Sequence, residues 1–545
     1  MQFQYKYSGN SSVASSTSQT SMSFAPDTLR SPTFFRGTLG KKLSFREAIS
    51  ALHAVVISDL RWRPKDREAY KAWAAEHEQE YLQNLLAENE TVRAKSERIQ
   101  AELRDINRQS HRVMGPFHKA RQQYFSYIYK RDRDAWFVLD PVITVHPDEV
   151  FFECFSQDES SYGRLGCSYE VFDKIEEFSC GTTNVDYSDA LYQEFQKIRN
   201  YKRTDLVVDP GGFAVETERE EAFKELKIDL PDSWVRGFLQ VSSAMTLPSV
   251  ELDLHPMDIY NLCFILRRKL EKTGPRSIRF QLRPGEPIQL VFEPWNTHLT
   301  CPRSIYHGPE ATEIRIWGRR RLLILERLIP IAQRFKVRLL GTGLPSFFIA
   351  DLGHLNFTLG LSGWTKNDWS RAGQFDLLAP RAQVDLYTKS QVFNALRETW
   401  SATADELAQK LQLDRAIVKG ALSAYAQAGR VIYDLNKDVY RVRELSREPL
   451  PFENLRFANE REAQAQRLLQ QNAVKVRAIH TETGILLKGE VRDGNQTYYT
   501  ELTIDRDQRL VAATCQCRFY VKNKLYQGPC EHILATRLCY AQGGA

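Results

Sequence analysis

Three cysteines and one histidine near the C-terminus have the spacing of metal ligands. They form Cys515-x-Cys517, a spacer of twelve residues, and Cys530-x-His532. Thiolate sulfur and imidazole nitrogen are the ligands that Zn²⁺ prefers, and a structural zinc ion takes four of them in a tetrahedron. Because no fifth candidate ligand lies close by, the pattern predicts a closed structural site with Zn²⁺ as its cofactor, rather than a catalytic centre with an open position.

The local structure expected around these residues favours their meeting. Residues i and i+2 of a strand lie on the same face, so Cys515 and Cys517 at a strand end present both sulfurs together. Gly528-Pro529 turns the chain before Cys530, and a helical run, Ile533–Tyr540, follows. Free thiols beside an unrelated histidine are the alternative, and the paired spacing disfavours it.

A short β-sheet followed by Cys-x-Cys, a spacer and Cys-x-His resembles the SWIM zinc finger, and all four ligand positions match. The resemblance covers only about the last 60 residues, at the end of the β-rich module of residues 474–545, and implies a module that contacts DNA or protein. Several upstream stretches are also similar to bacterial SWIM-containing proteins: Ser44-Phe-Arg-Glu-Ala, Val55-Val-Ile-Ser-Asp-Leu-Arg, Pro64-Lys-Asp-Arg, Ile316-Trp-Gly-Arg-Arg-Arg-Leu, Gly341-Thr-Gly-Leu-Pro-Ser and Leu359-Gly-Leu-Ser-Gly-Trp364. That similarity implies a MoxR-type ATPase and a von Willebrand A domain protein as partners, in systems thought to serve conflict or stress response.

Composition indicates a globular protein of several domains. The chain has 545 residues, of which 42% are hydrophobic and 26% charged, which excludes a chain that is disordered throughout. The net charge of +6 is too weak by itself to indicate a nucleic-acid partner. Nine cysteines, an odd and sparse set, do not fit a disulfide framework. No signal peptide and no membrane-spanning apolar run is visible, so we expect a cytoplasmic protein without a membrane partner.

The pattern along the chain predicts an α+β multidomain protein. Residues 1–34 are rich in Ser and Thr and are expected to be a disordered tail. Residues 35–135 are expected to be helical and coiled-coil-like, because residues 85, 92, 99 and 106 are apolar at heptad spacing. This helix pairs within the chain or between chains, or it packs as a long helix on its own domain. Residues 136–248 have a mixed α/β pattern.

Residues 249–380 suggest an internal repeat. Two stretches, starting at Val250 and at Glu313, each have the order β-α-β-β-β, and their halves could pair into one curved sheet with two helices on one face. Chance similarity of two α+β stretches is the alternative. The second helix is expected over Arg319–Arg334. Its start, Arg319-Arg320-Arg321, is either a solvated helix end or a site for an acidic surface.

Residues 385–445 look like a winged helix, with three short amphipathic helices followed by a hairpin. The third helix offers few cations for DNA, mainly Arg415 and Lys419, and residues 385–443 carry nine Lys/Arg against seven Asp/Glu. A DNA-reading domain usually has a denser basic face, so a protein contact is favoured. A charged, helical linker then leads to the β-rich module of residues 474–545.

The spacer between the two ligand pairs carries Arg518, Lys522 and Lys524 among three aromatic residues. Cations interleaved with aromatic rings suit single-stranded nucleic acid. The equal alternative is a basic loop that packs its aromatic rings around the zinc site.

No catalytic residue is assigned. The chain has no Gly-x-Ser-x-Gly and no His-Glu-x-x-His, and Gly341-Thr-Gly-Leu-Pro-Ser lacks the Gly-Lys-Ser/Thr ending of a phosphate-binding loop. We therefore expect a non-catalytic adaptor that recognises protein or nucleic-acid targets within a multi-protein system. The alternatives are a DNA-binding transcriptional regulator and an enzyme hidden in residues 136–359, which would need a pocket with clustered acids or histidines.

Overall fold

The computed structural model describes residues 12–15, 19–24, 33–58, 141–184, 195–201, 203–208, 232–270, 276–364, 368–370, 373–445, 460–482 and 484–542. The chain divides into two compact units, and the second, Leu60–Val138, lies outside these ranges. The predicted coiled coil falls in that unit. In the described part of the chain, no helix is long and apolar enough to cross a membrane.

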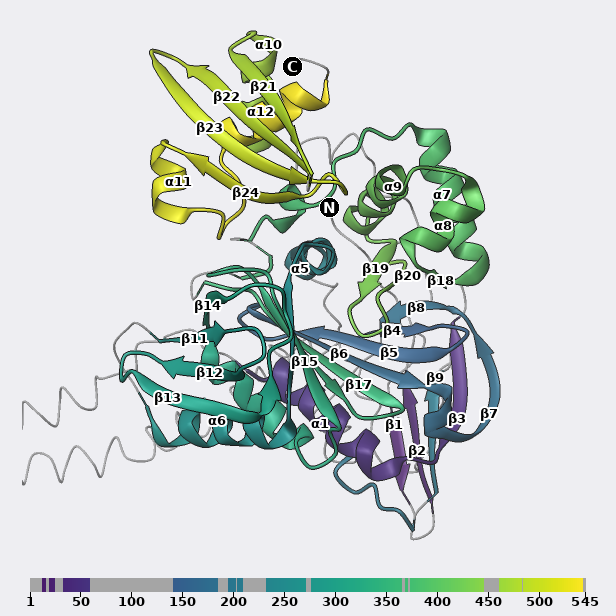
Figure 1. Ribbon diagram of the computed structural model, residues 1–545. Helices are drawn as coiled ribbons and strands as arrows, with labels where there is room; N and C mark the ends of the chain where they lie inside the picture. The colour runs from purple at the N-terminus through teal and green to yellow at the C-terminus, as the bar shows by residue number, and fades with distance from the viewer. Residues whose placement is uncertain are drawn as a thin grey trace, which may run out of the picture. The chain divides into compact units, whose positions relative to one another are not determined.

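An antiparallel sheet of eight strands is the largest in the first unit (Figure 1), in the order β10-β15-β16-β17-β6-β5-β4-β8. These strands are β4 (Val142–Val145), β5 (Glu149–Phe155), β6 (Ser161–Ser168), β8 (Gly181–Asn184), β10 (Val250–Leu254), β15 (Arg334–Leu339), β16 (Ser346–Asp351) and β17 (Leu355–Leu361). Helices cover both faces of its middle strands. From α1 (Lys42–Val56), Leu52 and Val55 lie against Gly163. From α5 (Asp232–Met245), Phe238 packs on Phe155 of β5.

The two β-α-β-β-β orders are present, but the expectation of one curved sheet is wrong. A second sheet has the order β13-β12-β11-β14. The remaining elements of the two stretches are α6 (Pro256–Arg268), β11 (Ser277–Leu282), β12 (Pro287–Phe292), β13 (Thr297–Ile305), β14 (Thr312–Trp317) and the 3₁₀ helix η2 (Arg319–Leu328). The first strand of each stretch pairs with the second strand of the other, β10 with β15 and β14 with β11. This exchange divides the strands between two sheets. A duplicated unit remains a prediction.

The second helix is a 3₁₀ helix, and its basic start is not solvated. Arg319 and Arg321 are buried. The Arg319 guanidinium donates to the carbonyl oxygens of Ser277 and Glu293, and the Arg321 guanidinium donates to the carbonyl of Ser160 at 3.1 Å. A basic first turn is unfavourable for an α-helix, and here the side chains bind carbonyls of neighbouring elements instead.

A third sheet has the order β1-β2-β9-β3-β7. Its strands are β1 (Ser12–Ser15), β2 (Gln19–Phe24), β3 (Phe34–Leu39), β7 (Phe172–Ser179) and β9 (Arg203–Val208). β1 and β2 lie in the segment expected to be a disordered tail, so that expectation is wrong for these residues. The polar composition suggested disorder, but β2 pairs in parallel with β9, which is remote in sequence. β3 likewise shows that residues 35–135 do not begin with a helix.

The segment expected to be a winged helix contains α7 (Leu386–Thr399), β18 (Ser401–Ala402), α8 (Ala404–Leu411), α9 (Arg415–Gln427), β19 (Val431–Asp434) and β20 (Val439–Val442). We call these elements the three-helix unit. The predicted capping box opens α8, because the Thr403 hydroxyl accepts from Glu406 N at 3.0 Å and the Glu406 carboxylate accepts from Thr403 N at 2.7 Å. The element order agrees with the prediction; the assignment as a winged helix stays a prediction.

The C-terminal module comprises α10 (Glu460–Gln470), β21 (Val474–Thr481), β22 (Gly484–Asp493), β23 (Gln496–Asp505), β24 (Leu510–Cys515), α11 (Arg518–Asn523) and α12 (Glu531–Ala541). Its strands form an antiparallel sheet in sequence order. α12 lies close against one face: a Cβ at Gly489 would come within 2.4 Å of the Thr536 hydroxyl, which hydrogen-bonds Thr500 at 2.8 Å. This packing places the start of α12 beside the end of β24.

Candidate metal centre

The four predicted ligands meet in one buried group. The ligand atoms of Cys515, Cys517, Cys530 and His532 all lie within 4.8 Å of one another. Cys515 ends β24, Cys517 is the N-cap of α11 and Cys530 is the N-cap of α12. Zinc–sulfur bonds of about 2.3 Å in a tetrahedron require sulfur–sulfur separations of roughly 3.8 Å. The observed group needs only a small contraction to reach that size, so these residues fit a zinc ion.

Backbone amides stabilise negative charge on two of the sulfurs. Cys517 N donates to the Cys515 sulfur at 3.4 Å, and Tyr520 N donates to the Cys517 sulfur at 3.3 Å. A hydrogen bond from the Cys530 thiol lowers the pKa of Cys515 to about 4. A thiolate is therefore favoured within the cluster, and the thiolate is the form that binds zinc.

A carboxylate orients the histidine ligand. His532 Nδ1 lies 3.9 Å from the Cys515 sulfur, and Nε2 lies 3.3 Å from Asp493 Oδ2. The ring also packs on Tyr498, with centroids 4.1 Å apart. This arrangement assigns Nδ1 as the metal ligand and Nε2–H as a donor to Asp493, which fixes the ring and its tautomer. Sequence reasoning missed Asp493, because an aspartate before Gly494 reads simply as a turn residue.

Arg461 of α10 holds the loop that precedes Cys530. Its guanidinium donates to the carbonyl oxygens of Gln527 and Pro529, both at 2.8 Å, and to the side chain of Gln374. It also lies 4.4 Å from the centre of the Phe519 ring. Burial lowers the pKa of Arg461 to about 10, and the nearby Glu531 and Cys530 act to raise it. This half-buried cation in the charged linker gave no signal in the sequence.

The aromatic ring of Tyr526 docks on the remainder of the first unit. It stacks on Trp364 with centroids 5.6 Å apart and ring planes 6° apart, and Trp364 in turn contacts Trp317. Gly343 has a φ of +76°, and a Cβ there would lie 2.7 Å from the Tyr526 ring. The glycine-rich segment after Gly341 is thus a tight turn that makes room for the finger.

The basic residues of the spacer lie at the surface, whereas their aromatic neighbours turn inward. Arg518, Lys522 and Lys524 are exposed. The Lys524 ammonium lies 5.1 Å from the centre of the Tyr520 ring. Tyr520 itself is buried, and its hydroxyl donates to the Ala513 carbonyl. Arg518 and Lys522 are exposed, and Lys524 is exposed beside the Tyr520 ring, but the spacer does not present a row of rings for base stacking.

The two cations predicted on the third helix are bound within the chain. The Lys419 ammonium lies 2.5 Å from a carboxylate oxygen of Asp507, a residue in the turn between β23 and β24. Arg415 lies 2.9 Å from Asp405 and 3.9 Å from Asp507. Burial lowers the pKa of Lys419, while its hydrogen bond to Asp507 acts to raise it. The structure therefore brings Arg415 and Lys419 together with Asp507 and does not group them with the spacer cations.

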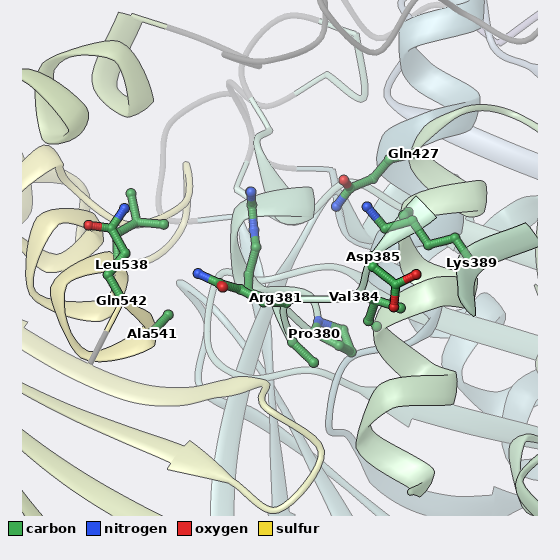
Figure 2. A pocket seen from close by; sticks show the side chains of 13 residues that line it. Pro380, Arg381, Val384, Asp385, Lys389, Gln427, Leu538, Ala541 and Gln542 are labelled. Carbon is green, nitrogen blue, oxygen red and sulfur yellow. The ribbon is translucent and has the colours of Figure 1, made fainter. Parts of the chain in front are cut away.

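A pocket of about 730 Å³ lies between the three-helix unit and α12 (Figure 2). Its lining includes Arg381, which pairs with Glu462 at 2.8 Å, and Leu538 of α12. The only carboxylate among the lining residues is Asp385, which accepts from Thr388 N and caps α7. These residues supply no paired acid and base.

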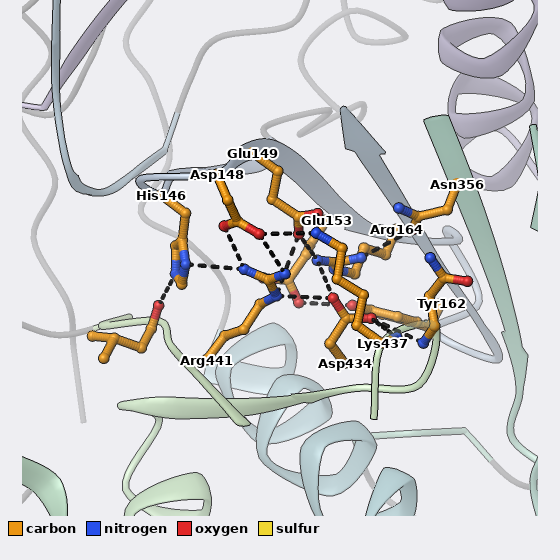
Figure 3. A network of polar contacts seen from close by, with 12 residues as sticks. His146, Asp148, Glu149, Glu153, Tyr162, Arg164, Asn356, Asp434, Lys437 and Arg441 are labelled. Atoms are coloured by element: carbon orange, nitrogen blue, oxygen red, sulfur yellow. Dashed lines mark hydrogen bonds and ion pairs between the residues drawn. The ribbon is translucent and has the colours of Figure 1, made fainter. Parts of the chain in front are cut away.

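Acids and a histidine do cluster between the β19–β20 hairpin and the strands β4 to β6, and most of them come from the region considered for a hidden enzyme (Figure 3). Four carboxylates there form ion pairs with four cations. The pairs are Glu149 with Arg164, Asp148 with Lys437 and Arg441, Asp434 with Arg441, and Glu153 with Arg443. Most of these side chains are buried. His146 joins them through Nδ1, which lies 3.3 Å from a guanidinium nitrogen of Arg441, and its Nε2 lies 2.6 Å from the Val442 carbonyl oxygen. We call these nine residues the buried ion network; its carboxylates are paired with cations rather than directed into a pocket.

The fold and this site together define an α+β protein with a Cys₃His metal-binding module at its C-terminal end. Residues 497–540 match the family model of the SWIM zinc finger. The chain thus carries a SWIM zinc finger, as its ligand spacing predicted.

No curated protein matches the chain. Among solved structures, it is similar to the proliferating cellular nuclear antigen of Entamoeba histolytica, with 11% identity, a TM-score of 0.29, and coverage of 41% of this chain and 89% of that one. A structure of the A. fulgidus antigen bound to the C-terminal region of FEN-1 gives 11% identity, a TM-score of 0.28, and coverage of 43% and 92%. At these TM-scores the likeness carries no argument about fold or function.

Proposed function

We propose that this protein is a non-catalytic adaptor that recognises a macromolecular target through its zinc-stabilised C-terminal module. The observation that carries the proposal is the closed Cys₃His group, in which Asp493 and Arg461 serve to position ligands and loops. Four protein ligands leave no open position on a zinc ion for substrate. When bound, zinc supplies the cross-link that holds β24, α11 and α12 together.

We propose protein as the primary target, with a MoxR-type ATPase and a von Willebrand A domain protein as partners in a bacterial system. The three-helix unit supports a protein contact over a DNA contact, because Asp507 and Asp405 already neutralise Arg415 and Lys419. Cations held in internal ion pairs add little to phosphate binding.

A DNA-binding transcriptional regulator that uses the winged helix and the SWIM finger is the second candidate. The exposed Arg518, Lys522 and Lys524 favour it. On this reading, DNA affinity falls steeply with salt, and Lys522→Glu together with Lys524→Glu reduces both the affinity and the salt slope. Absence of DNA binding at low salt would exclude this candidate.

The proposal is tested by pull-down of the tagged, full-length protein from native cells, with and without nuclease, followed by mass spectrometry. We expect protein partners to remain after nuclease treatment and to be lost from Cys530→Ser. Cys539→Ser is the matched control, because Cys539 lies on α12 outside the ligand group. Partners that disappear on nuclease treatment would instead favour the DNA-binding candidate.

A further inference from the structure

The strand β21 is an unusually open sheet edge. It has eight residues and pairs with β22 in continuous register from Val474 to Thr481. The other long edge strands of the described chain, β7 and β13, have register shifts, as does β24 at the opposite edge of the same sheet. The outer edge of β14 is covered, because Arg315 bonds Thr342 and Gly343. Bulges and covering turns are the usual protection of sheet edges, and among the residues that the structure describes β21 has neither.

The outward backbone groups of β21 can be assigned from its register. Arg492 N donates to the Ala473 carbonyl at 2.9 Å, which makes this an inward-bonded pair. Because inward and outward residues alternate in an antiparallel ladder, Val474, Val476, Ala478 and His480 direct their N–H and C=O groups away from β22. Within the described residues, the only contact to these groups is that of the Cys539 thiol, 3.9 Å from the Val474 carbonyl oxygen.

The charged side chains of β21 are basic, and the strand carries no negative charge. Lys475 and Arg477 are exposed on the sheet face opposite α12, and β21 carries no acid. No ion pair of either residue is found in the described part of the chain. The residues opposite Lys475 and Arg477 on β22 are Glu490 and Lys488. The charge of Lys488 is paired with Glu501 at 2.9 Å. Ile479, which is 38% exposed, adds an apolar contact on the same face.

We propose that the β21 edge binds an extended, acidic peptide segment of a protein partner, which adds as a fifth strand to the sheet. The peptide backbone pairs with the outward groups of Val476, Ala478 and His480, and alternate Asp or Glu side chains face Lys475 and Arg477. Strand addition draws affinity from backbone hydrogen bonds and specificity from alternate side chains. This inference rests on the adaptor function proposed above and names its docking surface.

Two other occupants fit less well. A second copy of β21, paired antiparallel, would bring Lys475 and Arg477 of both copies together, and like charges across strands are destabilising. A nucleic acid offers phosphates to the same cations, but it has no alternating row of donors and acceptors to match the outward amides.

The test uses the full-length, zinc-loaded protein and a fluorescent peptide of alternating valine and glutamate, as long as β21. We expect binding by fluorescence anisotropy, and slower amide hydrogen exchange confined to residues 474–481. Val476→Pro removes an outward N–H without removing a bond to β22. It should weaken peptide binding by at least about tenfold, which is a loss of about 1.4 kcal/mol of binding free energy. The double variant Lys475→Glu with Arg477→Glu should weaken it by a similar factor. Lys522→Glu with Lys524→Glu, in the spacer, is the charge-matched control for the double variant and should leave binding unchanged.

Zinc content and circular dichroism of each variant establish that it is folded. The proposal would be overturned if a valine–lysine peptide, or a peptide methylated at its backbone nitrogens, bound as tightly as the valine–glutamate peptide. It would also be overturned if the peptide slowed amide exchange outside residues 474–481. Single-stranded DNA that binds β21 in place of the peptide would overturn it as well. If Val476→Pro retains all partners in the native pull-down, the edge is not the docking surface although the adaptor function stands. If the wild-type protein retains no partner, the adaptor function fails independently of the peptide result.

Discussion

The three-helix unit and the C-terminal module are attached to the rest of the first unit by different physical means. The β19–β20 hairpin is attached by the buried ion network, in which Arg443 pairs with Glu153 at 3.1 Å and neither side chain is exposed. The C-terminal module is attached by Arg461 and by the stack of Tyr526 on Trp364, next to its metal ligands. The first attachment adds these ion pairs to the apolar contacts of Ile432 and Leu435, whereas the second includes a loop that lies next to the metal ligands.

This difference implies that the two attachments fail under different conditions. A buried ion pair is costly to assemble, but removing one partner leaves an uncompensated buried charge and is strongly destabilising. Structural zinc couples its binding free energy directly to folding. Loss of metal should therefore release the C-terminal module alone, whereas loss of a charge should loosen the three-helix unit alone.

The largest expected effect is that of Cys530→Ser or of chelation. Structural zinc contributes roughly 10–16 kcal/mol in small zinc modules, so the C-terminal module should lose its fold. Hydrogen exchange should become fast in β22 to β24 and remain slow in β19 and β20. The Cys539→Ser control should leave both regions protected. Fast exchange throughout the chain would contradict separate attachments.

Replacement of Glu153 by Ala should have the next largest effect, and on the other region. It leaves the Arg443 guanidinium buried without its partner and should cost about 3–5 kcal/mol of stability. We expect a lower midpoint in urea or heat with unchanged zinc content. Glu501→Ala is the matched control, because its pair with Lys488 is half exposed and should be worth less than about 1 kcal/mol. Equal effects of the two substitutions would show that burial of the network is unimportant.

Acid should weaken the attachment of the three-helix unit through the titration of His146 and Asp434, two residues of the buried ion network. Burial, followed by the charge of Arg441, lowers the pKa of His146 from 6.5 to about 3. The unfolded chain therefore binds a proton that the folded chain does not, so stability is complete above pH 6.5 and falls as the pH drops toward 3. Burial acts to raise the pKa of Asp434, but Arg164 and Arg441 outweigh it and lower the pKa from 3.8 to about 2. This carboxylate adds a further loss below about pH 4.

The pH prediction is checked by urea unfolding from pH 7 to pH 4, followed by hydrogen exchange in β19 and β20. His146→Gln keeps a hydrogen-bonding side chain without a titrating ring and should flatten the dependence between pH 6.5 and pH 4. An unchanged slope in this variant would remove His146 from the explanation.

The smallest effect is expected for Tyr526→Ala. An aromatic pair contributes about 0.5–1.5 kcal/mol beyond area burial, so overall stability should change little. We expect faster exchange in the turn around Gly343 and faster loss of zinc to a chelator. Tyr499→Ala is the control, because Tyr499 is 59% exposed on the sheet. Identical zinc loss in the two variants would mean that the docked ring does not support the finger.

Local patterns in the sequence were sufficient for much of the fold. The elements of the three-helix unit and of the last sheet follow from hydrophobic periodicity, capping residues and turns, each of which acts over a few residues. The two β-α-β-β-β orders were visible for the same reason. Their division between two sheets was not, because strand pairing between β10 and β15 is a contact between remote segments.

The sequence by itself determined the zinc ligands, because Cys-x-Cys and Cys-x-His are short patterns whose spacing carries the chemistry. Tertiary structure alone decided which groups support them. Asp493, Arg461 and Tyr526 act across distances in sequence at which an aspartate, an arginine or a tyrosine has no distinguishing neighbours. It also decided which cations are paired. Arg319 and Lys419 look like surface cations in the sequence. In the folded chain, Arg319 donates to backbone carbonyl oxygens and Lys419 pairs with the carboxylate of Asp507, and both partners are remote in sequence.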